Sequence, residues 1–182
     1  MIGYISYDGS IVVEIIIKIK NMSKTTRGKH IQKLSYMAGF FDGEGSIYIT
    51  KTLNKRSGNY VYILGIGCSN SEREPIDILH NMFSPYRKTH THTYGRKSTY
   101  KDCYIWVATS NVALNFLKII EPYLLVKKKQ AMLGIKFQEW RNELPRASRK
   151  RTPDIIKESE KYRYEMKKLN GTLNWNVSSR ND

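Results

Sequence analysis

The chain has 182 residues, which is enough for one domain or for one domain with an added segment. Its 31 Lys and Arg residues outnumber its 16 Asp and Glu residues, so the net charge is +15 and the pI is about 9.8. This excess predicts a polyanionic partner: DNA, RNA or an anionic membrane surface. The longest apolar run, IVVEIIIKIK, contains charged residues and is too short to span a bilayer, which excludes a membrane-spanning segment there.

The two cysteines, Cys68 and Cys103, lie in apolar, strand-like runs without the CxxC spacing of zinc sites. They are typical of reduced core residues in an intracellular protein and argue against a disulfide framework. His90 and His92 form an H-x-H pattern, but no further Cys or His accompanies them. We therefore interpret them as solvent-facing or groove-facing residues rather than metal ligands.

The first 30 residues are predicted to be an extension of the domain. Residues 1–21 could form a hairpin around Asp8 and Gly9. Such a hairpin could pair with the edge of a larger sheet, or it could be a dispensable segment upstream of Met22. Residues 23–30 are polar and basic, and this pattern indicates a linker.

From residue 31 onwards the sequence alternates between helical and strand-type periodicity. Residues 31–41 are predicted to form a helix with Leu34, Met37 and Phe41 on one side. Two strands, a helix, a hairpin about Gly95 and two helices then follow, over residues 46–54, 60–69, 73–83, 86–110, 111–125 and 127–144. This order predicts an α+β domain over residues 31–144, built on an antiparallel sheet.

Residues 145–182 are predicted to be a basic linker followed by a C-terminal helix. The segment PRASRKR has four basic residues in seven, among them Arg149, Lys150 and Arg151. It could track phosphates or be an ordinary solvated linker. Thr152 is a typical helix cap, and Gly171 stands just past the expected helix end.

The stretch LSYMAGFFDGEGSIYI places Asp42 and Glu44 among glycines at the end of the first predicted helix. A carboxylate there faces the negative end of the helix dipole, an unfavourable position that a bound cation would relieve. Mg²⁺ prefers carboxylate and other hard oxygen ligands, and glycines leave space for a phosphate. The alternative is an ordinary tight turn, in which Asp and Gly are common. The spacing alone does not decide between the two.

The nine residues AGFFDGEGS resemble the signature motif of the LAGLIDADG homing endonucleases without a gap. The segment EPYLLVKKKQAML is similar to a second recurring stretch of that family, and the predicted element order is similar to its αββαββα core. The resemblance covers about residues 31–144. It implies a saddle-shaped antiparallel sheet and a metal-dependent endonuclease that cuts both strands of a long pseudo-palindromic DNA site.

The resemblance also assigns roles to the motif residues. Glu44 matches the family's metal-binding acid, the Gly43 carbonyl would be a further metal ligand, and Asp42 matches the more structural first acid. The implied cofactor is Mg²⁺, with two or three ions shared across a dimer, and Ca²⁺ would support binding without cleavage.

Three further residues are assigned by position. Asn70 falls where the family often has a polar residue that organises the attacking water. Lys127 matches the basic residue that stabilises charge near the scissile phosphate, with Lys128 and Lys129 as alternatives. Arg73 could serve as a second basic residue, although Glu72 and Glu74 flank it.

The sequence contains one copy of the motif, which in this family implies a homodimer. The first helices of two chains would pack across a two-fold axis and bring two Glu44 side chains together. Bound cations would offset the repulsion between these carboxylates. The expected interface residues are Leu34, Met37, Ala38, Gly39 and Phe41.

Two such sheets would form a saddle that follows roughly two turns of the major groove. Alternating residues of the first strand are expected to contact DNA, although an ordinary solvated face explains each of them equally well. Basic residues that flank the second hairpin, and others in the C-terminal basic segment, should add contacts. The expected DNA-binding residues are Ser46, Tyr48, Thr50, Thr52, Asn54, Arg73, Arg87, Lys88, Arg96, Lys97, Arg149, Lys150 and Arg151.

The function best supported by the sequence is therefore a sequence-specific double-strand DNA homing endonuclease encoded within an intron. We expect it in a mitochondrion or chloroplast, or in archaeal or bacterial cytoplasm. One alternative is a maturase that binds its intron RNA. Another is a DNA-binding module that has lost catalysis, although the presence of Glu44 and Lys127 argues against it.

Overall fold

The computed structural model of the chain describes residues 23–55, 58–83, 90–92, 103–144 and 152–172. The predicted hairpin over residues 1–21, the turn about Gly95 and the basic segment 145–151 lie outside these ranges. The described elements are α2 (Lys24–Glu44), β1 (Gly45–Asn54), β2 (Asn59–Asn70), α3 (Arg73–Phe83), β3 (His90–His92), β4 (Cys103–Thr109), α4 (Ser110–Ile120), the 3₁₀ helix η1 (Glu121–Tyr123), α5 (Lys128–Glu143) and α6 (Pro153–Leu169). This order confirms the predicted α+β fold with an αββαββα core and a C-terminal helix.

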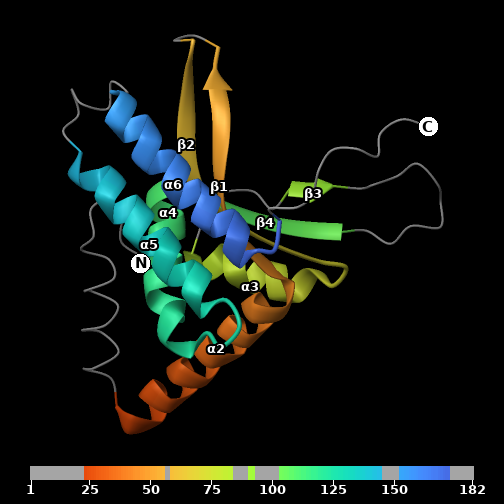
Figure 1. Cartoon of the computed structure of the whole chain (residues 1–182). Helices are drawn as coiled ribbons and strands as arrows, with labels where there is room; N and C mark the ends of the chain where they lie inside the picture. The colour runs from red at the N-terminus through yellow and green to blue at the C-terminus, as the bar shows by residue number, and fades with distance from the viewer. Residues whose placement is uncertain (1–22, 56–57, 84–89, 93–102, 145–151, 173–182) are drawn as a thin grey trace.

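The four strands form one antiparallel sheet in the order β1-β2-β4-β3. Apolar side chains from neighbouring strands share one face, because Ile47 lies opposite Ile66 and Ile49 lies opposite Leu64. All four are buried, and the helices α3, α4, α5 and α6 contact β1, β2 or β4. We call the other face, which carries Ser46, Thr50 and Thr52, the open face. The β1–β2 hairpin extends beyond the helical layer at the top of Figure 1.

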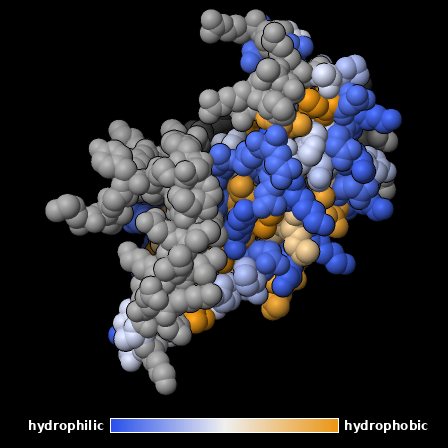
Figure 2. Space-filling model, turned by 90° about the vertical axis from the view of Figure 1, so that its left-hand side faces the viewer, coloured by the Kyte–Doolittle hydropathy of each residue, from blue (hydrophilic) through white to orange (hydrophobic). Residues whose placement is uncertain are grey.

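The core between the sheet and the helices is built around aromatic rings. Phe116 of α4 contacts Phe41, Phe83 and Trp106, with ring centroids 4.8–4.9 Å apart. These edge-on and tilted arrangements are the ones that aromatic pairs favour. The coloured part of the face in Figure 2 is mainly hydrophilic, with hydrophobic residues in small patches between polar ones. No helix in the described part of the chain is long and apolar enough to cross a membrane.

Helix α2 begins earlier than the sequence pattern indicates. It starts at Lys24, after Ser23, whose Oγ accepts a hydrogen bond from the Thr26 backbone N–H at 3.3 Å and so caps the helix. The prediction of a linker over residues 23–30 was therefore wrong. The helix also continues through both motif acids to Glu44, and Gly45 ends it by donating its N–H to the Phe41 carbonyl.

Helix α6 lies along the free edge of β1 and is attached to it at two points. Near the hairpin tip, Glu160 accepts hydrogen bonds from Lys51 and from the Tyr62 hydroxyl. At the base of the strand, Asn170 Nδ2 donates to the Ile47 carbonyl at 2.8 Å. As predicted, Thr152 caps this helix, and Gly171 follows it with a φ of +68°. The helix therefore supports the hairpin along its length and covers part of an otherwise open sheet edge.

We predict that Gly134→Val lowers the free energy of unfolding by about 1–3 kcal/mol through overpacking. Gly134 of α5 lies against the sheet, and a Cβ atom there would be 3.0 Å from Leu64 Cδ1 and 3.2 Å from Leu117 Cδ1. Urea unfolding followed by circular dichroism measures the change. Met132→Val, at an exposed position of the same helix, is the matched control and should cost about 0.5 kcal/mol or less. Equal losses in the two variants would contradict close packing at Gly134.

Candidate active site

The corner formed by the end of α2 and the start of α5 is held together by Asp42. Its Oδ2 accepts hydrogen bonds from the backbone N–H groups of Leu125 and Val126, at 2.7 and 3.1 Å. Its Oδ1 accepts one from the Lys127 N–H at 2.8 Å. The Lys127 ammonium in turn donates to the main-chain carbonyl of Asp42. The first acid of the motif therefore fixes the loop that carries Lys127.

The folded structure stabilises the ionised form of Asp42, because it lowers the pKa of this carboxyl group. Partial burial opposes ionisation and is the largest single influence on this group. The hydrogen bonds from Leu125, Lys127 and Val126, with the charge of Lys127, together outweigh burial and lower the pKa below its usual value of 3.8. Asp42 is therefore ionised at neutral pH and engaged through both oxygens.

Glu44 and Lys127 are both close enough to Cys68, at the end of the sheet where β1 begins, for their charges to affect its thiol. Gly45 pairs with Cys68 across the two strands, and Cys68 is buried beneath the corner. The pKa of the Cys68 thiol is raised to about 12, mainly by burial. The negative charge of Glu44 adds to this effect and the positive charge of Lys127 opposes it, so both charges act on one thiol. The structure thus brings Asp42, Glu44 and Lys127 together, from segments far apart in the sequence.

The oxygen atoms at this corner suit a hard divalent cation. Glu44 is exposed, and within the described residues it makes no hydrogen bond or ion pair that would occupy its carboxylate. The Gly43 carbonyl belongs to the last turn of α2, where main-chain carbonyls have no partner within the helix. No group of three or more His, Cys, Asp or Glu side chains in the described ranges is arranged to hold a metal ion. At this corner Glu44 is the carboxylate left available, because both oxygens of Asp42 are engaged, and carboxylate and carbonyl oxygens are ligands that Mg²⁺ prefers.

Asn70 has a local structural contact in this structure. Its Oδ1 accepts a hydrogen bond from the Glu72 backbone N–H at 2.8 Å, just before α3 begins. By the strand register it lies on the helix-covered side with Cys68, whereas Ser69 is exposed on the open face. The role of Asn70 toward the attacking water stays a prediction. Ser69 was not among the predicted residues of the open face, although its alternation with the apolar Cys68 indicated that it lies there.

The predicted basic DNA contacts are only partly described. Arg73 Nε forms an ion pair with Asp77 Oδ2 at 2.9 Å, but the Arg73 side chain remains 66% exposed. It is therefore free to exchange this partner for a phosphate. The other predicted basic contacts lie outside the described residues: Arg87, Lys88, Arg96, Lys97, Arg149, Lys150 and Arg151.

The predicted first-strand residues do share the open face. Ser46 Oγ donates to the Gly67 carbonyl at 3.3 Å, and Thr50 Oγ1 donates to the Ile63 carbonyl at 3.4 Å. Thr52 and Asn54 are exposed nearer the hairpin tip. The strands β1, β2 and β4 contain no Asp or Glu, so this face carries no acidic side chain from them. Hydroxyl groups without acids are well suited to approach a polyanion.

On the open face, the ring of Tyr48 lies over a glycine of the neighbouring strand. Its partner in β2 is Gly65, and a Cβ atom at Gly65 would be only 2.2 Å from the Tyr48 ring. Glycine is required here because the ring occupies the space of a side chain. Burial raises the pKa of the Tyr48 hydroxyl above 10.0, which keeps it protonated and able to donate a hydrogen bond.

The predicted dimer interface needs correction. Leu34, Met37, Ala38 and Phe41 do lie on one side of α2, but all are at most 4% exposed because they pack into their own chain. They are not available to a second copy, so their assignment to the interface was wrong. Gly39 is exposed, with no atom near its Cβ position, and its place at an interface stays a prediction.

We predict that Asp42→Asn lowers the free energy of unfolding by about 1–3 kcal/mol at neutral pH, because three N–H groups lose a charged acceptor. The folded-state pKa of Asp42 lies below the unfolded value of about 3.9, so the stabilisation is present above that value. It is lost as the pH falls through the folded-state pKa. Chemical unfolding of both proteins from pH 7 to pH 3 measures this, and the difference between them should shrink at acid pH. A difference independent of pH would contradict a charge-dependent clamp.

Solved structures share this fold at low sequence identity. No curated protein matches the chain. The fold is similar to the archaeal intron-encoded homing endonuclease I-Vdi141I in complex with DNA (TM-score 0.59, 17% identity, covering 77% of this chain and 85% of that one). It is also similar to I-CvuI in complex with the I-CreI target (0.57, 17%, 76% and 82%). The group I intron-encoded homing endonuclease I-CeuI with DNA is similar over 96% of this chain and 93% of that one (0.57, 14%).

The family is established by the sequence. Residues 37–143, which include the α2 acids, the sheet and the Lys127 loop, match the model of the LAGLIDADG endonuclease family. This range covers more than half of the chain and contains each element of the corner described above. The chain therefore belongs to the LAGLIDADG endonuclease family.

Proposed function

We propose that this protein is a Mg²⁺-dependent homing endonuclease that cuts both strands of a long, sequence-specific DNA site as a homodimer. The observation that carries the proposal is that the Asp42 clamp holds the Lys127 loop beside the end of α2, which carries Glu44, next to a sheet face to which β1, β2 and β4 contribute no acidic side chain. A carboxylate that can hold a cation and a lysine that can stabilise charge on a phosphate are groups that assist phosphodiester hydrolysis. Family membership supports the same activity.

The proposed roles follow from the contacts of each residue. Glu44 and the Gly43 carbonyl would hold Mg²⁺, which when bound supplies positive charge next to the scissile phosphate. Lys127 would donate hydrogen bonds to a phosphate oxygen, after exchanging its contact with the Asp42 carbonyl. Asp42 is a positioning residue, because both of its oxygens hold the Lys127 loop. Among neighbouring proteins, I-CvuI was crystallised with DNA in the presence of Mg and of Ca.

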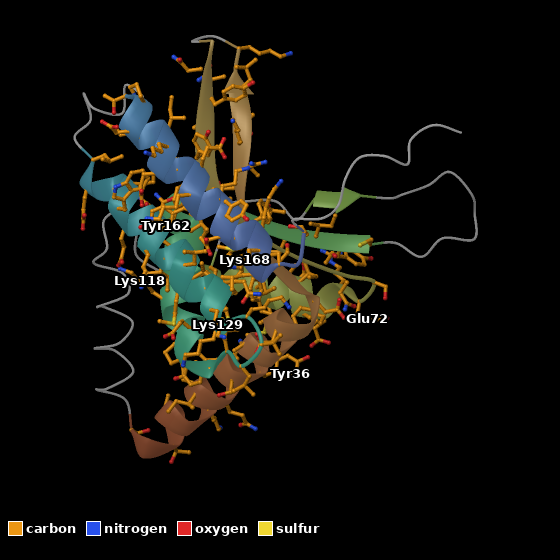
Figure 3. The ribbon with its side chains drawn as sticks, viewed as in Figure 1. Tyr36, Glu72, Lys118, Lys129, Tyr162 and Lys168 are labelled. Carbon is orange, nitrogen blue, oxygen red and sulfur yellow. The ribbon has the colours of Figure 1, made fainter. Side chains whose placement is uncertain are left out.

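The homodimer is proposed to form through the side of α2 opposite to the one first expected. Tyr36 is 58% exposed and points away from the sheet (Figure 3), and Gly39 and Gly43 have no atom within 4 Å of their Cβ positions. Two glycines four residues apart form a smooth patch that permits close approach of two helices. Leu125 and Val126, held beside α2 by Asp42, are 88% and 71% exposed and would extend the apolar contact. Such a dimer would place the two copies of Glu44 on either side of the axis.

We predict that Glu44→Gln abolishes cleavage and leaves DNA binding in Ca²⁺ largely intact. The amide keeps the shape of the side chain but loses the charge that would hold Mg²⁺. The measurement is cleavage in Mg²⁺ of a plasmid that carries the intronless form of the host gene, with gel-shift binding in Ca²⁺. Glu143→Gln, at an exposed position at the end of α5, is the matched control and should cut normally.

The outcomes of this experiment separate the alternatives. Normal cutting by Glu44→Gln would show that the metal assignment is wrong. Binding without cutting by the unmodified protein would favour a non-catalytic DNA-binding module.

We predict that Gly39→Leu converts the dimer to a monomer without destabilising the chain. Leucine has a higher helix propensity than glycine by nearly 1 kcal/mol, and its Cβ would meet nothing in the same chain. A second α2 helix, however, could no longer approach closely. Sedimentation velocity and urea unfolding measure the two effects. Gly28→Leu, also at an exposed and open position of α2, is the control and should remain dimeric; a dimeric Gly39→Leu protein would refute this interface.

A further inference from the structure

A cleft of about 450 Å³ lies between β1 and α6, between the two points that attach the helix to the strand. Residues 48–52 line it on the strand side, and Arg163, Met166, Lys167 and Asn170 line it on the helix side. The attachments are the contact of Glu160 with Lys51 near the hairpin tip and that of Asn170 with the Ile47 carbonyl near the base. The cleft is therefore framed by fixed contacts at both ends.

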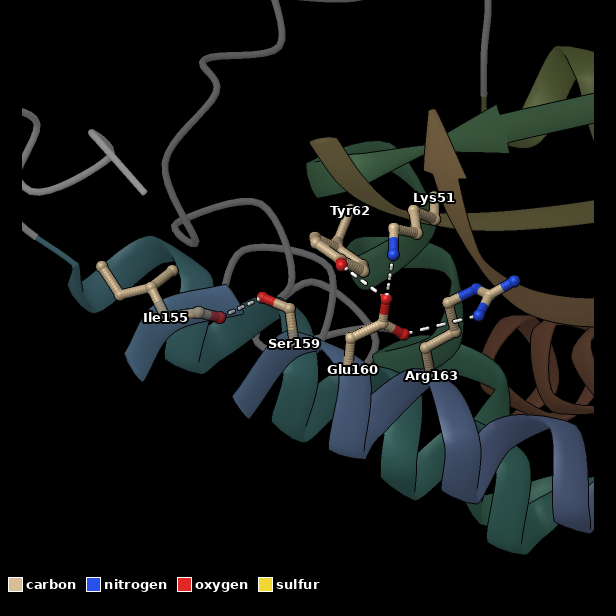
Figure 4. Close-up of polar contacts among 6 residues, drawn as sticks. All are labelled: Lys51, Tyr62, Ile155, Ser159, Glu160 and Arg163. Carbon is tan, nitrogen blue, oxygen red and sulfur yellow. Dashed lines mark hydrogen bonds and ion pairs between the residues drawn. The ribbon is translucent and has the colours of Figure 1, made fainter. Parts of the chain in front are cut away.

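The charge in this cleft is positive. Its charged lining residues are Lys51, Arg163 and Lys167, and no Asp or Glu lines it. Glu160, which lies behind the lining, forms ion pairs with both Lys51 and Arg163 (Figure 4). Lys167 has no ion-pair partner among the described residues. Lys51 and Arg163 thus share one carboxylate, and the three lining cations carry a net positive charge.

The backbone of β1 adds hydrogen-bond donors to the same cleft. The Ile47 carbonyl points to α6, since Asn170 donates to it. In an antiparallel strand, alternate residues direct both main-chain groups to the same side. The N–H groups of Ile49 and Lys51 therefore face the unpaired edge, on the side of the cleft. Main-chain N–H groups with lysine and arginine make a site for an anion with several oxygens, such as a phosphate.

The cleft is continuous with the open face of the sheet. Its lining includes Thr50 and Thr52 from the open face and Ile49 and Lys51 from the helix-covered face, so it wraps around the strand edge. A duplex lying on the open face would have base edges over the middle of the strands and sugar–phosphate backbone over their margins. The cleft lies at the margin that the outer edge of β1 forms.

We propose that this cleft binds a backbone phosphate of the duplex DNA that lies on the open face, with Lys167 as its main cationic contact and Arg163 as the second. The proposal rests on the proposed DNA binding and adds α6 to the DNA-contacting surface. Glu160 then has a second role: it holds Lys51 and Arg163 at the cleft while it fixes the hairpin. The contact is with phosphate, so it contributes affinity and register and does not read bases.

The test is the salt dependence of DNA binding by Lys167→Ala. The probe is a fluorescein-labelled duplex DNA of mixed sequence, titrated by anisotropy at several KCl concentrations in Ca²⁺. Loss of one phosphate contact should reduce the slope of log K against log salt by about 0.9. Lys168→Ala is the matched control, since this neighbouring lysine (Figure 3) is exposed but does not line the cleft, and its slope should equal that of the unmodified protein.

The outcomes separate this proposal from the proposed function. If the unmodified protein does not bind duplex DNA in a salt-dependent manner, the proposed function itself fails. If it binds and Lys167→Ala keeps the full slope, the cleft proposal is overturned and the endonuclease proposal stands. A loss seen with a hairpin RNA probe but not with the DNA would also overturn it. Lys167→Gln, which keeps most of the side-chain stem, decides the matter if Lys167→Ala does not fold.

Discussion

The arrangement of the candidate active site depends on one carboxylate, that of Asp42. It joins the end of α2 to a loop 83 to 85 residues later in the chain. A carboxylate at the C-terminal end of a helix is repelled by the helix dipole, but the N–H groups it binds lie at the start of α5, where the dipole is positive. Asp42 therefore connects the negative end of one helix to the positive end of another. This connection holds the segments that carry Glu44 and Lys127 next to each other.

The sheet could be predicted closely because strand periodicity reports directly on burial. Ile47 and Ile49 alternate with Ser46, Tyr48 and Thr50, and the structure buries the first set and leaves the second exposed or partly buried on the open face. Leu53 follows the same alternation but is 49% exposed, because the hairpin extends beyond the helices that cover its base. A period of two residues shows which face a side chain is on. It does not show how far along the strand the helices packed on that face extend.

The faces of α2 show a second limit of sequence patterns. The spacing of Leu34, Met37 and Phe41 correctly indicated one apolar side, but periodicity does not say whether that side meets the same chain or a second copy. The helix start was missed for a different reason: residues 24–30 make no apolar stripe, and the helix there is favoured by the cap at Ser23. The long-range polar contacts of Asp42 and Glu160 leave no periodic signal at all, so only the folded structure could reveal them.

In the proposed complex with DNA, affinity and specificity would come from different parts of the protein surface. Ser46 and Thr50 donate their hydroxyl protons to main-chain carbonyls, which leaves their lone pairs as acceptors toward the solvent side. Such acceptors match the amino groups that adenine and cytosine present in the major groove. Basic side chains, in contrast, lie at the margins: Arg73 at the start of α3, and Arg163 and Lys167 beside the edge of β1. The attraction of basic side chains to phosphates is strong and independent of sequence, and here it would act beside the strand face that would read the bases. A net charge of +15 is therefore compatible with selective recognition of DNA.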